Sequence, residues 1–340
     1  MSQEKSKVTI YDVADHAGVA ISTVSRVLNA SSDVSEPTRV RVLKAIQELE
    51  FRPDRTAKSL AQKATKSFAV AIPTFTMPFH TELLKGIRFR LRNQDIDLLL
   101  CDLGSTSPEQ TLLNFLSRGA VDGLLLVGVP VEDRLVHELR ALHAPVVLVG
   151  SVHPDFDSFH WDDRTGATAA IDHLVALGHE HIGVIASHTE STVQDERIDG
   201  VETAMKRAGL PFGRTHVFTG QTEKHAGFSE EAGYEAMERI LTEAPEITAV
   251  FAMSDVQAIG AWKAVRDAGR DVPGDVAIVG YDDIKSSYYI GLSSVDQRMH
   301  WVGEEATRLL LMRMEGDDEG KPLDRVIVPE LIARSSSAPG

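Results

Sequence analysis

Aromatic and acidic side chains stand close behind segments that are predicted to be buried strands. Phe75 and Phe79 follow the apolar run 68–72, and Trp161 follows a shorter run. Asp282 stands at the end of a later apolar segment. An aromatic face can pack against the C–H face of a sugar or against a base, and a carboxylate accepts hydrogen bonds from hydroxyl groups. These residue types favour a ligand that carries hydroxyl groups, such as a carbohydrate.

Patterns that mark catalytic or metal sites are absent or weak in this sequence. We find neither a Gly-x-x-x-x-Gly-Lys-Ser/Thr phosphate loop nor a Gly-x-Ser-x-Gly nucleophile turn. His179 and His181 could suggest a metal, yet residues two apart at the start of a strand point to opposite faces. The single cysteine, Cys101, excludes a disulfide framework within the chain. We therefore expect no enzyme, no metal and no other cofactor.

Strands and helices alternate from residue 67 onward. Strands are expected at 68–72, 96–101, 123–127, 146–149, 181–185, 249–251 and 276–280. Helices are expected at 79–93, 109–117, 166–177, 196–208, 233–241 and 255–267. Apolar strands between amphipathic helices predict parallel sheets covered on both faces, and about 270 residues suffice for two doubly wound subdomains. Ligands of such folds bind beyond the carboxyl ends of the strands, which places the expected site in a cleft between the subdomains.

The first 50 residues predict three short helices instead. Thr9 can cap the first helix, and Gly18 can end it because glycine readily adopts a positive φ. The second helix is expected at 21–28, and the third begins at Ser35, its expected cap, with Pro37 in its first turn. Its apolar residues recur at helical spacing: Val40, Leu43, Ile46 and Leu49. This pattern is typical of the helix-turn-helix motif, although a helical bundle without a ligand would share it.

The charge is distributed unevenly along the chain. The net charge is −15, but residues 1–66 hold 11 Lys and Arg against 8 Asp and Glu. A slightly basic head could approach phosphate groups while the acidic remainder is repelled by them. No apolar run approaches the roughly 18 residues of a membrane span, and the first residues lack the apolar core of a signal peptide. We expect a cytoplasmic protein that does not enter the membrane.

Several N-terminal motifs carry a resemblance to a known family. They are Thr9-Ile10-Tyr11-Asp12-Val13-Ala14, Gly18-Val19, Ser22-Thr23-Val24-Ser25-Arg26-Val27-Leu28-Asn29, Val34-Ser35, Thr38-Arg39 and Phe51-Arg52-Pro53. In these motifs the chain resembles the lac/gal repressor (LacI/GalR) family of bacterial transcription regulators, and similarity continues to about residue 336. The resemblance implies an α/β protein with an N-terminal three-helix helix-turn-helix head, a hinge helix and a periplasmic-binding-protein-like core of two doubly wound subdomains.

The resemblance implies a DNA-binding role for the head. Helix 21–28 would lie in the major groove, where Ile21 and Ser22 choose bases and Arg26 contacts guanine. Phosphate contacts would position the helix without reading the sequence. The residues implied in this positioning are Thr9, Tyr11, Thr23, Ser25 and Asn29. Segment 54–66 would be the hinge helix and linker, in which Leu60, flanked by the small residue Ala57, wedges between base steps in the minor groove.

The resemblance also implies domain boundaries and an effector site. Residues 1–53 would form the DNA-binding domain and 67–340 the effector-binding and dimerisation domain. The N-subdomain would comprise about 67–162 and 296–324, and the C-subdomain about 163–295 and 325–336. The implied effector-binding residues are Phe75, Phe79, His80, Trp161, Arg197, Ser254, Asp255 and Asp282. Thr222 and Ser254 depart from residues common among sugar-binding members, which leaves the identity of the ligand open.

These observations predict a ligand-responsive DNA-binding regulator. We expect a repressor of sugar-utilisation genes that binds a palindromic operator in double-stranded DNA as a homodimer, with a small molecule, most simply a sugar, in the cleft. One alternative is a sugar-binding transport protein of the same core fold, against which the head and the missing signal peptide count. Another is a regulator that responds to purines or nucleosides. Because no Leu heptads follow residue 334, we expect a dimer and no coiled-coil tetramer.

Overall fold

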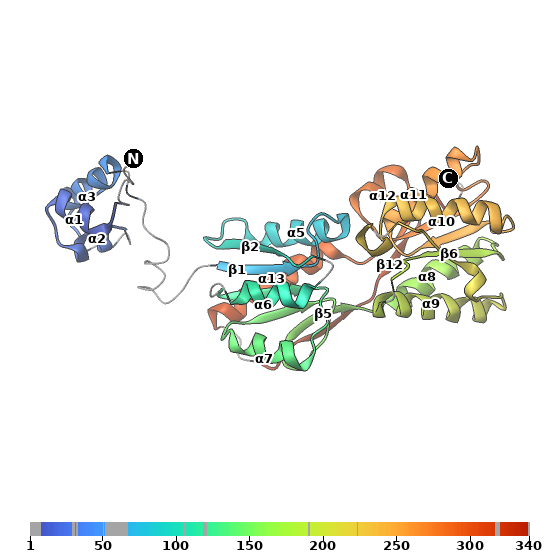
Figure 1. Cartoon of the computed structure of the whole chain (residues 1–340), viewed down its shortest axis with the longest axis horizontal. Helices are drawn as coiled ribbons and strands as arrows, with labels where there is room; N and C mark the ends of the chain where they lie inside the picture. The colour runs from blue at the N-terminus through green and yellow to red at the C-terminus, as the bar shows by residue number, and fades with distance from the viewer. Residues whose placement is uncertain are drawn as a thin grey trace, which may run out of the picture. The chain divides into compact units, whose positions relative to one another are not determined.

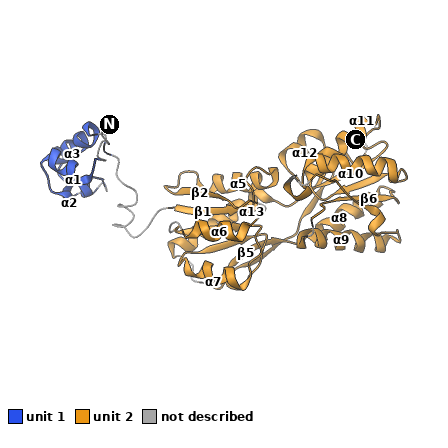
Figure 2. Ribbon diagram, in the orientation of Figure 1, with its two compact units in different colours: residues 1–65 blue, residues 66–340 orange. Residues whose placement is uncertain are grey.

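The computed structural model describes residues 8–28, 31, 33–49, 51, 67–104, 107–117, 121–189, 191–222, 224–316 and 320–338. The chain divides into two compact units, residues 1–65 and 66–340 (Figure 2). The predicted site residues Asn29, Ala57 and Leu60, with the whole expected hinge segment 54–66, lie outside the described residues. No helix in the described part of the chain combines the length and the apolar character that crossing a membrane requires.

The first unit contains helices α1 (Ile10–Ala17), α2 (Ile21–Leu28) and α3 (Glu36–Glu48). The cap at Thr9 is confirmed as a reciprocal pair: the Thr9 backbone N–H donates to Asp12 Oδ2 at 2.7 Å, and the Asp12 N–H donates to Thr9 Oγ1 at 3.4 Å. Gly18 ends α1 at φ 61°, as predicted. Ser35 occupies the N-cap position of α3, but its hydroxyl pairs with Thr38 Oγ1 at 2.9 Å and caps no backbone N–H.

The apolar stripe predicted for α3 is wrong in part. Val40 and Leu43 are 56% and 50% exposed, whereas Val42 and Ala45 are buried against the other two helices. Helical spacing gives the period of a stripe, and the small side chain of Ala45 lets α3 approach α1 on a face rotated from the predicted one.

The second unit contains two six-stranded sheets (Figure 1). The first has the order β11-β5-β4-β3-β1-β2, with β1 (Ser67–Ile72), β2 (Asp97–Asp102), β3 (Gly123–Val127), β4 (Val146–Val149), β5 (Asp157–Trp161) and β11 (Asp324–Ile327). The second has the order β12-β10-β9-β8-β6-β7, with β6 (Ile182–Ala186), β7 (Val217–Thr219), β8 (Ala249–Ala252), β9 (Ala277–Asp282), β10 (Ser293–Asp296) and β12 (Glu330–Ile332). All neighbouring strands run parallel except β10 and β12, which are antiparallel.

Helices cover both faces of each sheet, as the apolar strands predict. On the first sheet, α5 (Pro78–Leu91) and α13 (Met299–Glu315) pack on one face, and α6 (Pro108–Leu116) and α7 (Asp133–Ala141) pack on the other. On the second sheet, α8 (Asp163–Ala176) and α9 (Thr192–Ala208) lie opposite α10 (Glu230–Glu243) and α11 (Asp255–Asp267). Three further short helices are α12 (Lys285–Ile290), η1 (Arg214–His216) and η2 (Lys224–Gly227).

The chain crosses between the sheets three times. Two crossings lie near the expected positions, between β5 and α8 and between β10 and α13. The third was expected near residue 325, but Ile327 still pairs with Trp161 in the first sheet, so the chain crosses after Ile327. Strand β11 buries only Ile327 and lies at the edge of its sheet. It therefore lacks the apolar pattern by which a strand is recognised in a sequence.

Candidate functional site

Helix α2 of the first unit presents a polar face. Val24 and Val27 are buried in the core of the unit, which turns Ile21, Ser22 and Arg26 to the surface. The predicted contacts Thr23 and Ser25 are half-buried at the edges of this face. On neighbouring α1, Tyr11 is 64% exposed, and the Thr9 hydroxyl donates to Asp12 Oδ2 at 2.7 Å. The structure therefore leaves the predicted base-reading side chains of α2 accessible to a groove.

In the second unit, three predicted effector residues lie together at the carboxyl ends of β1 and β5. The Phe79 ring in the first turn of α5 lies 5.2 Å from the His80 ring and 6.3 Å from the Trp161 ring, measured between centroids. Phe75, in the loop before α5, is exposed. His80 Nδ1 is buried and has no hydrogen-bond partner among the described residues. Burial lowers the pKa of His80 to about 4, against a backbone hydrogen bond at Thr74, so its ring is neutral at pH 7.

Arg197 is held by the protein on three sides. Its Nε donates to Asp163 Oδ1 at 2.8 Å, its Nη1 donates to the Met253 carbonyl at 2.6 Å, and its guanidinium lies 3.7 Å from the centroid of the Tyr281 ring. Only 5% of the residue is exposed. Burial disfavours the charged guanidinium and by itself would lower the pKa of Arg197. The ion pair with Asp163 opposes this and keeps the pKa of Arg197 above its usual value. Two of the three guanidinium nitrogens are therefore committed to protein acceptors.

Asp282 lies beside Arg197 at the end of β9, in a left-handed conformation with φ 115°. Its Oδ1 accepts a hydrogen bond from Gln297 Nε2 at 2.6 Å. Burial raises the pKa of Asp282 well above its usual value, and the charge of Arg197 opposes that shift. Gln297, which the sequence analysis missed, stands in the crossing between β10 and α13, and its carbonyl accepts from Trp161 Nε1 at 2.8 Å. A hydrogen-bonded chain thus links the Trp161 cluster to Asp282.

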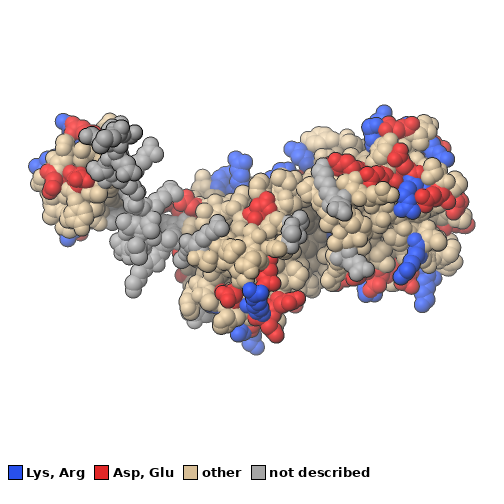
Figure 3. Space-filling model, viewed as in Figure 1, with Lys and Arg blue, Asp and Glu red and all other residues tan. Residues whose placement is uncertain are grey.

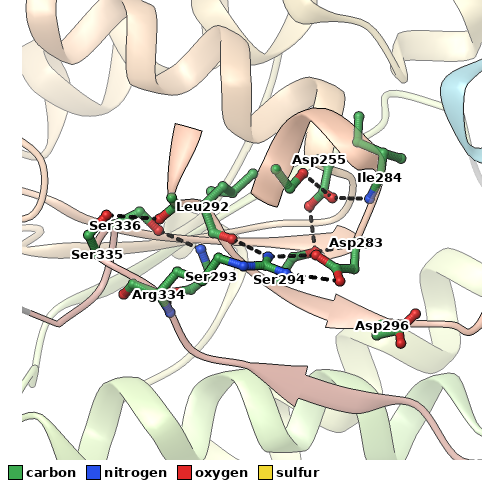
Figure 4. Close-up of polar contacts among 12 residues, drawn as sticks. Asp255, Asp283, Ile284, Leu292, Ser293, Ser294, Asp296, Arg334, Ser335 and Ser336 are labelled. Carbon is green, nitrogen blue, oxygen red and sulfur yellow. Dashed lines mark hydrogen bonds and ion pairs between the residues drawn. The ribbon is translucent and has the colours of Figure 1, made fainter. Parts of the chain in front are cut away.

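Asp255, another predicted effector residue, is bonded within the protein, and its contact with a ligand stays a prediction. Asp255 is 0% exposed, and its carboxylate accepts from the Ile284 N–H at 2.9 Å and from the hydroxyls of Ser287 and Ser294, both at 2.6 Å (Figure 4). Burial raises the pKa of Asp255 to about 7, although these hydrogen bonds oppose the shift. The side chain points back from the start of α11 to the β9–α12 turn. Its role is to hold that turn.

Ser254 is confirmed as the N-cap of α11. It is buried, its Oγ accepts from the Gln257 N–H at 3.3 Å, and its hydroxyl lies 3.2 Å from Gln257 Oε1. These bonds account for the capping half of the prediction. Ligand contact by Ser254 stays a prediction.

The C-terminal segment reinforces the same turn. Arg334 donates to both carboxylate oxygens of Asp283, at 2.6 and 3.0 Å, and to the Leu292 carbonyl at 2.7 Å (Figure 4). The Asp283 N–H donates to Ser294 Oγ at 3.0 Å. Residues distant in sequence thus fix the backbone that carries Asp282.

A cavity of about 400 Å³ opens between the subdomains on one side. It is lined by Thr76, Pro78, Thr81, Glu82, Lys85, Ile284, Lys285, Ser286 and Tyr289. These residues come from the α5 region of the first sheet and the α12 region of the second, and none of them is a predicted effector residue.

Acidic side chains are frequent on the face of the second unit seen in Figure 3. Within the described residues, no group of three or more His, Cys, Asp or Glu side chains could hold a metal ion.

Comparisons with known proteins divide the chain in the same way. Residues 9–54 match the model for bacterial regulatory proteins of the lacI family, and residues 171–337 match a periplasmic binding protein-like domain. A curated relative is the HTH-type transcriptional repressor PurR of Haemophilus influenzae (strain PittEE), 34% identical over 336 residues, which cover 96% of this chain and 98% of the relative.

Solved structures extend the similarity to nearly the whole chain. The transcriptional regulator CelR in complex with cellobiose is 31% identical, with a TM-score of 0.68 over 97% of this chain and 99% of that one. The lac repressor dimer bound to operator and the anti-inducer ONPF is 27% identical, with a TM-score of 0.80 over 98% and 99%. The motifs, the helix-turn-helix unit, the paired sheets and these relatives agree. The chain belongs to the lacI family of bacterial regulatory proteins and is a ligand-responsive DNA-binding repressor, not an enzyme.

Proposed function

We propose that this protein represses sugar-utilisation genes by binding a palindromic operator as a homodimer, and that a neutral carbohydrate controls its operator affinity. The observation that most favours a carbohydrate is the cluster of Phe79, His80 and Trp161. It places aromatic faces beside His80 Nδ1, which has no hydrogen-bond partner among the described residues. A sugar offers C–H faces to the rings and hydroxyl groups to the nitrogen. Asp282 supplies a hydroxyl acceptor from the other subdomain.

On the DNA side, the exposed face of α2 enters the major groove. Ile21 packs against a thymine methyl, Ser22 bonds a base edge, and Arg26 donates to guanine. Tyr11 holds the phosphate backbone and contributes affinity without reading sequence. The segment 54–66, with Leu60 as wedge, is the hinge in this proposal.

A second copy of the chain is the partner expected at the β2 edge of the first sheet. Leu99 and Leu100 on β2 and Phe89 on α5 are exposed, and among the described strands β2 stands at the end of its sheet. Exposed apolar side chains at the edge of a sheet favour an interaction with a partner, and the lac repressor of similar structure is a dimer. A homodimer carries two copies of α2, one for each half-site of a palindrome.

Charge favours a neutral ligand over a phosphorylated one. The guanidinium of Arg197 is already neutralised by Asp163, and the Asp282 carboxyl group lies beside it. Burial and the charge of Asp163 raise the pKa of nearby Glu196, as expected where acidic groups crowd together. An anionic ligand would therefore find the charge of Arg197 already balanced by Asp163.

A purine effector is the second candidate. It is favoured by the similarity to the PurR repressors over 96% of the chain and by the same aromatic rings, which can stack on a base. A purine base would need edge donors and acceptors in place of the hydroxyl contacts.

A thermal-shift panel separates these candidates. A ligand at a hundredfold excess over its Kd stabilises the folded protein by about 2.7 kcal/mol, or about 5 °C in Tm for a domain of this size. We expect cellobiose or glucose to raise Tm, and glucose 6-phosphate, guanine and hypoxanthine to do so less. An Asp282→Asn variant should lose most of the sugar effect. If only the purine bases raise Tm, the purine candidate replaces the carbohydrate.

A further inference from the structure

Gln297 is bonded to both subdomains from a position inside the crossing between β10 and α13. It is buried, its side-chain amide donates to Asp282 Oδ1 at 2.6 Å, and its main-chain carbonyl accepts from Trp161 Nε1 at 2.8 Å. Trp161 ends β5 in the first sheet, whereas Asp282 ends β9 in the second. A single residue of the crossing therefore connects the carboxyl ends of strands from the two sheets.

The backbone on both sides of this connection is strained. Asp282, Asp283 and Arg298 have φ values of 115°, 47° and 55°, which non-glycine residues rarely adopt. Such conformations persist only where surrounding contacts over-determine them, and they are common where a site must switch. Gln297 lies between two of the strained positions in space, because it bonds Asp282 and directly precedes Arg298.

Other contacts hold this turn without reaching the first sheet. Arg334 binds the Asp283 carboxylate, and Ser294 accepts from the Asp283 N–H. Both partners belong to the second sheet or to the segment that follows it. Gln297 differs from Arg334 and Ser294 because its main-chain carbonyl also accepts a hydrogen bond from Trp161, which belongs to the first sheet.

We propose that Gln297 is a positioning residue that transmits the state of the Asp282 carboxylate to the crossing and, through Trp161, to the first sheet. The inference rests on the proposed function in one respect: a ligand hydroxyl that donates to Asp282 competes with Gln297 Nε2 for the same carboxylate. When the ligand hydroxyl displaces Gln297 from Asp282, the crossing loses this hydrogen bond to the second sheet. A ligand can shift the orientation of the subdomains only if it interacts differently with the two orientations.

The test follows the indole N–H of Trp161 in the full-length protein without a ligand. Indole signals are assigned in ¹⁵N-labelled protein by replacing Trp161, Trp262 and Trp301 in turn by Phe. Every residue at position 297 supplies a carbonyl to Trp161, so a purely local role for the Gln297 side chain would leave that N–H unchanged. We expect Gln297→Met to make exchange of the Trp161 N–H with solvent about tenfold faster or more. The N–H of Trp262 should stay at its wild-type rate.

Gln257→Met is the matched control. Gln257 is also a buried glutamine of the second subdomain, and its Nε2 donates to the Gly227 carbonyl at 2.9 Å. Within the described part of the chain, its hydrogen bonds go to Ser254 and Gly227 and not to the crossing. We expect it to leave Trp161 exchange unchanged. Equal acceleration in both variants, or exchange within about twofold of wild type in Gln297→Met, would overturn the proposal.

A charge exchange provides the test if Gln297→Met does not fold. Gln297→Glu places two carboxylates together and should accelerate Trp161 exchange, and adding Asp282→Asn restores one hydrogen bond with its polarity reversed. Recovery of slow exchange in the double variant supports the proposal, and a double variant as fast as Gln297→Glu alone contradicts it. No ligand is used in these exchange experiments, so their outcome does not depend on whether a sugar is the effector.

Discussion

Replacing Arg197 by alanine is expected to lower the free energy of unfolding by about 3–5 kcal/mol. The substitution leaves the Asp163 carboxylate buried without its partner and removes the donor to the Met253 carbonyl. It also removes the guanidinium from the face of Tyr281. Urea unfolding of the full-length protein, followed by circular dichroism and by tryptophan emission, measures the loss. A missing ligand response in this variant would then reflect the lost framework as much as a lost ligand contact.

Arg164→Ala is the matched control for this prediction. Arg164 pairs with Asp199 at 2.6 Å, but the two side chains are 56% and 49% exposed. A pair so open to solvent contributes less than about 1 kcal/mol. Equal losses in the two variants would contradict the view that Arg197 is part of a buried ion pair.

Asp255→Asn is expected to change how stability depends on pH. Burial raises the pKa of Asp255 from 3.8 to about 7, so the folded protein holds a proton that the unfolded chain releases between these values. The stability contributed by that proton is present below pH 3.8 and is lost as pH rises through about 7. The unfolding free energy of the wild type, minus that of the variant, should fall by up to about 1.4 kcal/mol per pH unit between pH 5 and 7 and level off above 8.

Asp267→Asn, at the other end of α11, provides the comparison. A hydrogen bond from Lys263 lowers the pKa of Asp267, so it stays ionised from pH 5 to 8 and should add no slope there. His80 also titrates in acid, because its pKa is depressed, but it is common to all three proteins and cancels in the differences. Urea titrations at pH 5, 6, 7 and 8 test the prediction. A flat difference for Asp255→Asn would show that its carboxyl is ionised throughout.

Strongly apolar segments made much of the fold predictable. Strands β3 and β4 and helix α11 have the bounds that the sequence predicts, because continuous apolar strands and a serine cap mark their ends. Helices α7 and α13 and the short strands β7, β10, β11 and β12 were not predicted. The edge strands bury too few side chains to show a period. The predicted apolar stripe of α3 was rotated from the buried face for a related reason, because only packing decides which side of a short helix is buried.

The site was less predictable because its contacts join distant parts of the chain. The Ser254-Asp255 pair marks the start of a helix, but the partners of the Asp255 carboxylate come from residues 284, 287 and 294. Those long-range bonds give Asp255 a structural role that the sequence did not predict. Gln297 carries no motif, and its importance follows only from the two bonds that it makes in space. Sequence indicated which residue types gather at the strand ends, and three-dimensional pairing decided which of them are bonded to other parts of the protein.

The most direct test of a ligand-controlled repressor is a titration of DNA at fixed salt, with and without sugar. Sequences bound by the full-length protein are first selected from random duplexes, and an Ile21→Ala, Ser22→Ala variant serves as the control for base reading. We predict a palindromic consensus that the control variant no longer prefers. The sugar with the largest effect on Tm should change the operator Kd by about 5- to 150-fold when saturating. Binding without sequence preference, or a Kd that saturating sugar leaves within about twofold, would contradict the account.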